Sequence, residues 1–177
     1  SLFNFRIETI QRVLQFLSFC FHLEFLIAGT FILKRYISNK PILFLCIALL
    51  YFWPSSILHS ARIGNDNLYY CFYGFSILFL CKWYDNEKTI DLALFTLSAL
   101  LCIYTKINGI VILGCFGIIV LIKFFLVKEK KQFIVRVLPS VVILSSAVFR
   151  YLSPITCSND FRYILPVIII LPVFLGS

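Results

Sequence analysis

Methionine is absent from the 177-residue chain, and charged residues make up only 14% of it. Soluble domains contain about 25% charged and about 45–50% apolar residues. This chain is 61% hydrophobic, with a mean hydropathy of +0.97. The scarcity of charge argues against a water-soluble fold, because too much apolar surface would face water. The apolar runs also lack the apolar–polar alternation that an outer-membrane barrel requires.

Several chemical signatures are missing as well. The seven cysteines include no C-x-x-C pair, so the sequence predicts no zinc site and no redox pair. It contains no glycine-rich phosphate loop, no nucleophile elbow and no H-E-x-x-H motif. The chain starts at Ser1 and ends inside an apolar run. We therefore expect it to be part of a longer protein.

What the sequence does contain is a series of apolar runs separated by short polar segments. This pattern predicts an all-α, polytopic transmembrane bundle of about seven spans, forming a single transmembrane domain over residues 1–177. We expect a mixed segment at 1–11 to lie along the membrane interface. The apolar runs that follow cover about 13–33, 41–53, 67–83, 89–104, 110–127, 133–152 and 162–177.

The basic residues divide the connecting loops into two sets, and alternate loops must share a side of the membrane. The loops at 34–40, 82–91 and 123–136 hold ten Lys and Arg residues, whereas those at 54–66, 104–109 and 150–162 hold four. Arg6 and Arg12 raise the second count to six. The positive-inside rule then predicts that the first set is cytoplasmic and the N-terminus is not. This distribution accounts for the net charge of +8, so we expect no nucleic-acid partner.

The longest polar interruption, residues 54–66, lies on the predicted non-cytoplasmic side. His59, Arg62 and Asp66 are spaced i, i+3 and i+7, which places them on one face if the segment is helical. An imidazole, a guanidinium and a carboxylate at the mouth of a bundle are suited to a polar or anionic group.

Simpler roles compete with this interpretation. Asn65-Asp66 and Asn159-Asp160 stand where helices are predicted to start, so they are also candidates for N-caps. Arg62, Lys106 and Arg162 are cations suited to a phosphate, but a cation such as Lys106 or Arg150 can instead snorkel to lipid headgroups. His59 is a candidate ligand for a metal or substrate, or a hydrogen-bonded polar residue.

The first apolar run also carries a carboxylate. Glu24 lies near its middle, and a carboxylate at that depth is costly unless it is paired. We expect it to face a polar cavity or to pair with a base in the region expected upstream of Ser1.

Three polar motifs occur in a fixed order. The first runs from Trp53 to Asp66, the second is Tyr104-Thr-Lys-Ile-Asn-Gly109, and the third is Ser158-Asn-Asp-Phe-Arg-Tyr-Ile-Leu-Pro166. Over roughly residues 45–172 the set resembles the GT-C class of membrane glycosyltransferases. The likeness is strongest to the dolichyl-phosphate-mannose protein mannosyltransferases and the bacterial aminoarabinose transferases that act on lipid A.

The resemblance implies an inverting hexosyltransferase in the bacterial inner membrane or the endoplasmic reticulum membrane. The donor would be a sugar on a polyprenyl phosphate, used on the non-cytoplasmic side, with membrane lipids as further partners and an unidentified acceptor. Arg62, Lys106 and Arg162 would then stabilise the leaving phosphate. Asp66 and His59 would line the sugar or acceptor pocket, or hold a divalent cation if the enzyme uses one. The full set of implied substrate-binding residues is His59, Arg62, Asn65, Asp66, Lys106, Asp160, Arg162 and Tyr163.

One family feature is missing from the chain. Members carry the catalytic carboxylate in a large loop after the first span, and residues 1–177 contain no such loop. We expect the general base to lie upstream of Ser1, so that this stretch alone is inactive.

Two other functions explain the same cations. A transporter or flippase of an anionic lipid-linked substrate would also gather them, but it would need broken helices at mid-membrane and an internal repeat, and no clear repeat is visible. A non-catalytic subunit that only binds lipid is the third hypothesis.

Overall fold

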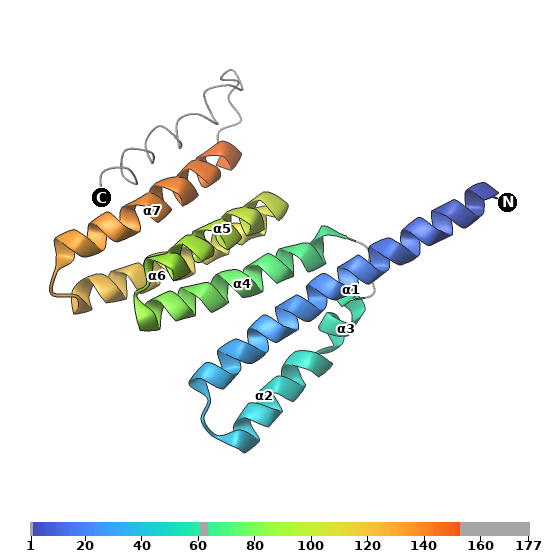
Figure 1. Ribbon diagram of the computed structural model, residues 1–177, viewed down its shortest axis with the longest axis horizontal. Helices are drawn as coiled ribbons and strands as arrows, with labels where there is room; N and C mark the ends of the chain where they lie inside the picture. Colours follow the sequence, from blue (N-terminus) through green and yellow to red (C-terminus); the bar gives the residue numbers. More distant parts are fainter. Residues whose placement is uncertain (1, 61–63, 153–177) are drawn as a thin grey trace.

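The computed structural model describes residues 2–60 and 64–152, with the side chains of all of these except 2–7, 55, 56, 59, 151 and 152. Helix is the regular secondary structure found throughout this part of the chain (Figure 1). In chain order the elements are α1 (Leu2–Tyr36), α2 (Lys40–Phe52), α3 (Pro54–Ser60), α4 (Asn65–Asn86), α5 (Thr89–Thr105), the 3-10 turn η1 (Ile107–Ile110), α6 (Val111–Leu126) and α7 (Lys130–Leu152).

The all-helical prediction is confirmed, and three stretches are long and apolar enough to cross a membrane. They are Glu8–Tyr36, Ile107–Leu126 and Lys130–Arg150. Lys40–Phe52 and Thr89–Thr105 are apolar but shorter, at 13 and 17 residues. A helix needs about 20 residues to cross the hydrocarbon core. The described residues therefore indicate a membrane protein with three helices that are both long and apolar enough to span, and the seventh predicted run lies outside them.

The separate interfacial segment predicted for residues 1–11 is wrong. Residues 2–36 form one continuous helix, whose N-terminal end projects past the other helices (Figure 1). Gly29 is the one helix breaker in this stretch, and proline is absent from it. The backbone therefore has no reason to leave the helix between the polar and apolar parts.

The core lies between α4, α5, α6 and α7. Phe95, Cys102 and Ile103 of α5 are fully buried there, together with Ile112 of α6. The Phe95 and Phe116 rings lie 4.8 Å apart, which joins α5 to α6. The outer surface is just as apolar, so packing inside the bundle, rather than escape from water, must hold these helices together.

Helices α1 and α4 pack in the same direction. Near one end the Asn67 side chain donates a hydrogen bond to the Ser18 hydroxyl at 2.6 Å. Between them Gly74 admits α1 closely, because a Cβ at this position would lie 3.1 Å from the Phe25 ring and 3.4 Å from the Ala28 methyl. The carboxylate expected to need a partner receives a hydrogen bond from α4, since the Cys71 thiol lies 3.0 Å from Glu24 Oε2.

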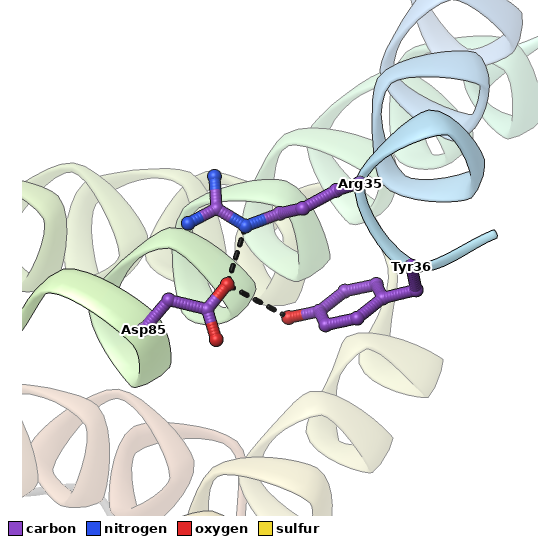
Figure 2. A network of polar contacts seen from close by, with 3 residues as sticks. All are labelled: Arg35, Tyr36 and Asp85. Carbon is purple, nitrogen blue, oxygen red and sulfur yellow. Dashed lines mark hydrogen bonds and ion pairs between the residues drawn. The ribbon is translucent and has the colours of Figure 1, made fainter. Parts of the chain in front are cut away.

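Contacts at both ends of the bundle join loops that the sequence placed on the same side. At one end, here called the basic end, Asp85 accepts hydrogen bonds from the Arg35 guanidinium and, at 3.3 Å, from the Tyr36 hydroxyl (Figure 2). Lys123 pairs with Glu87 at the same end. The loops around residues 66 and 106 meet at the opposite end, here called the motif end. This agrees with the predicted sorting of the loops, and the assignment of the basic end to the cytoplasm remains a prediction.

Candidate functional site

Two motif residues meet at the motif end. Asp66 lies in the first turn of α4, directly after Gly64 and Asn65. Lys106 follows α5, where the backbone turns extended, with φ −153° and ψ 133°. The two residues are 40 positions apart in the sequence, and Lys106 Nζ lies 2.6 Å from Asp66 Oδ1.

This ion pair is open to water on one side. The Lys106 and Asp66 side chains are 41% and 42% exposed, and the ammonium lies 6.0 Å from the centre of the Tyr69 ring. An ammonium has three donors, and the bond to Asp66 uses one of them. The pair can therefore offer further N–H groups to an anion while Asp66 fixes the position of the nitrogen.

The turn after Lys106 fixes its backbone. The Lys106 N–H donates to the Cys102 carbonyl at 3.1 Å, and the Gly109 N–H donates to the Lys106 carbonyl at 2.9 Å. Gly109 is buried against the end of α5, where a Cβ would lie 2.8 Å from the Ile103 nitrogen. An Asn-Gly dipeptide is typical of a tight turn, and here it forms part of the 3-10 turn η1.

An aromatic residue and a second cation lie on neighbouring elements. The Arg150 guanidinium, in the last turn of α7, is 5.6 Å from the centre of the Tyr104 ring near the end of α5. Arg150 was predicted to snorkel to lipid, and the stacking on Tyr104 is a contact that the sequence interpretation missed. Tyr69 is another residue of the site that was not among the predicted substrate-binding residues, although its i+3 spacing from Asp66 places the two on one helical face.

The remaining predicted residues divide into two groups. Asn65 is the exposed first residue of α4, and His59 falls within α3 with its side chain outside the described part. The other four candidates lie outside the described residues: Arg62, Asp160, Arg162 and Tyr163.

Two local predictions for the first motif are wrong. The N-cap of α4 is Gly64, with no side-chain capping bond, and the Asp66 carboxylate reaches across to Lys106 instead. A continuous helical face from His59 to Asp66, which required one helix over the segment, does not form, because Gly64 is a bend directly before α4. Gly64 has φ 178° and ψ 166°, an extended backbone that separates the two helices.

The described residues contain no set of metal ligands. No three His, Cys, Asp or Glu side chains among residues with described positions gather closely enough to hold a metal ion. The divalent cation considered from the family resemblance therefore gains no ligand set here.

The ion pair predicts a pH dependence at high pH. The hydrogen bond to Asp66 raises the pKa of Lys106 above its ordinary value of 10.5. A raised lysine pKa stabilises the fold fully below the ordinary pKa, and this contribution is lost as the pH rises through the raised value. The difference in thermal stability between the wild type and Lys106→Met should therefore be constant near neutral pH and shrink above pH 10.5. Thermal unfolding of both proteins in detergent, near neutral pH and above pH 10.5, measures this difference. A difference that is the same in both pH ranges would contradict the ion pair between Lys106 and Asp66.

Comparisons of the chain with protein-family models, with curated proteins and with solved structures find no match. The resemblance to GT-C glycosyltransferases therefore depends on the three motifs alone. The structure describes the second motif fully and the first in part, and it brings these two together.

Proposed function

We propose that the chain belongs to a membrane glycosyltransferase that moves a sugar from a polyprenyl phosphate to a protein, lipid or glycan acceptor. In this proposal the bundle has about seven spans, its N-terminus is non-cytoplasmic, and the motif end faces the periplasm or the lumen. The observation that supports it is the ion pair between Lys106 and Asp66, which unites two motifs at one end of the bundle.

The chemistry of the site fits a phosphate leaving group. As the bond between the sugar and the lipid phosphate breaks, negative charge grows on the phosphate oxygens. An ammonium held in place beforehand stabilises that charge without having to reorganise. Asp66 holds the Lys106 nitrogen at 2.6 Å, and Lys106 would donate its other N–H groups to the phosphate.

The opposite charges of Lys106 and Asp66 also matter for binding a phosphate. The Asp66 carboxylate would repel a phosphate if it stood alone, so it is useful next to the leaving group only while Lys106 neutralises it. Asp66, held next to Lys106, would then line the sugar or acceptor pocket beside the phosphate.

A release assay tests the proposal. Membranes containing the full-length protein, with the expected catalytic loop, would be supplied with polyprenyl-phosphate sugars of several kinds, and the released polyprenyl phosphate would be measured. Loss of one preorganised donor to a developing charge typically costs about 100-fold in turnover. We expect Lys106→Gln to lower release by about this factor and Lys106→Arg to retain part of the activity.

The matched control is Lys88→Gln, which removes an exposed lysine at the basic end and should leave release unchanged. Asp66→Asn combined with Lys106→Gln should lower release by less than the product of the single effects, because the two residues act as a unit. A wild type that releases nothing from any donor, or a folded Lys106→Gln protein with full activity, would overturn the proposal.

A further inference from the structure

A groove of about 450 Å³ runs between α5 and α7, on the outside of the bundle. Ligand pockets typically fall between about 300 and 1,000 Å³. Some of the side chains that line the groove are short, among them Ala93 of α5 and Pro139 and Ser140 of α7. The two helices touch across its floor and leave space above it, and Figure 1 shows them side by side.

The residues at the floor of the groove are buried, and their hydroxyl groups already have hydrogen-bond partners. Leu92, Thr96 and Ser140 line it and are buried. The Thr96 hydroxyl lies 2.8 Å from both the Leu92 carbonyl and the Ser140 hydroxyl, so these polar groups bond to one another. The walls are apolar, formed by residues such as Leu97 and Val135. The floor and walls are therefore suited to a hydrocarbon chain.

The mouth of the groove, unlike its apolar walls, is lined by polar and charged residues. Arg136 and Thr89 line it near the basic end. Arg136 is six residues into α7, about 9 Å along the axis from Lys130. A guanidinium at that depth, exposed beside an apolar groove, is stabilised by an anion that it can bind bidentately.

The charges around the mouth favour an anion. Lys88 and Lys130 are exposed at the start of the two helices, and Lys128 and Lys131 are exposed nearby. Glu129 is the exposed acid within this stretch. Asp91 is buried and stands 200° around α5 from Thr89, away from the groove. The acids Asp85 and Glu87 are already paired with Arg35 and Lys123.

We propose that this groove binds an anionic phospholipid, with one acyl chain between α5 and α7 and the phosphate on the Arg136 guanidinium. The apolar walls alone would accept any lipid chain, so the selectivity comes from the cations at the mouth. The site lies at the end of the bundle opposite Asp66 and Lys106, and it does not depend on the proposed transferase activity.

Lipid adducts counted by native mass spectrometry test the site on the detergent-purified chain. Phosphatidylglycerol and phosphatidylcholine with the same acyl chains would be titrated separately. One cation near a membrane surface is worth about a fivefold change in binding of an anionic lipid. We expect the wild type to prefer phosphatidylglycerol, Arg136→Gln to reduce that preference about fivefold, and Arg136→Lys to reduce it less. Ala93→Trp should fill the groove and remove the tightest adduct of both lipids.

Arg12→Gln is the matched control, because it removes an equal charge from the exposed part of α1, far along the chain from the groove. It should leave the preference unchanged. Equal binding of the two lipids by the wild type would overturn the proposal, as would an equal loss in Arg12→Gln and Arg136→Gln. If Ala93→Trp still retains the adduct while remaining helical and monodisperse, the lipid lies elsewhere and the groove assignment is wrong.

Discussion

Gly109→Ala is expected to lower the free energy of unfolding by about 3 kcal/mol, the upper end of the cost of an overpacked methyl group. The added Cβ would lie 2.8 Å from the Ile103 nitrogen and 2.9 Å from both the carbon and the oxygen of the Cys102 carbonyl group. All three are backbone atoms at the end of α5, so no side-chain rotation relieves the clash. Far-UV circular dichroism during titration with sodium dodecyl sulfate in mixed micelles measures the change.

Gly114→Ala provides the matched control within the next helix. A Cβ at Gly114 meets nothing within 4 Å, and alanine stabilises a helix interior by up to about 1 kcal/mol relative to glycine. The two substitutions add the same methyl group five residues apart and should act with opposite signs. Equal effects would show that η1 does not pack against α5 in the way described.

Phe95→Ala is expected to destabilise the bundle by about 3 kcal/mol, the lower end of the usual range for a buried phenylalanine. Phe95 is 0% exposed and its ring lies 4.8 Å from that of Phe116, so the substitution leaves a cavity between α5 and α6. The loss falls at the lower end because lipid is as apolar as the core, and only the packing contribution disappears. The same titration in mixed micelles measures it.

Phe125→Ala removes an identical side chain that is 78% exposed on α6. Its ring touches that of its sequence neighbour Phe124, with the ring centres 6.0 Å apart, and most of its surface faces outward. The change should therefore stay within about 0.5 kcal/mol. If both phenylalanine variants lose the same stability, Phe125 is packed as closely as Phe95, and the position of the core described above is wrong.

Much of the helical architecture could be predicted from the sequence. The apolar run predicted at 89–104 corresponds to the helix Thr89–Thr105, and the run predicted at 67–83 corresponds to the helix Asn65–Asn86. In a lipid environment each helix must satisfy its own backbone, so the edges of an apolar run nearly coincide with the ends of a helix. The continuity of α1 could not be read this way, because a change in polarity at residue 12 does not break a backbone hydrogen-bond ladder.

The site was harder to predict for a different reason. Lys106 and Asp66 were chosen because cations and carboxylates are rare in such a chain, yet their pairing depends on how α4 and α5 pack, which no local pattern contains. The capping prediction for Asp66 failed because a nearby ammonium is a stronger partner for a carboxylate than a backbone N–H. The contact between Tyr104 and Arg150 was not predicted, because it depends on how α5 packs against α7.

The common direction of α1 and α4 has a consequence for the residues between them. Because the chain leaves α1 at one end of the bundle and enters α4 at the other, it must return along the length of the bundle between them. Helices α2 and α3 form this returning segment. At about 1.5 Å per residue, the 13 residues of α2 and the 7 of α3 rise about 30 Å together, and a hydrocarbon core is about 30 Å thick. Trp53 is extended ahead of Pro54, so the returning segment is divided into two helices at a proline. Neither helix alone reaches the length of a spanning helix, and the chain returns along the bundle through two short helices in place of one long one.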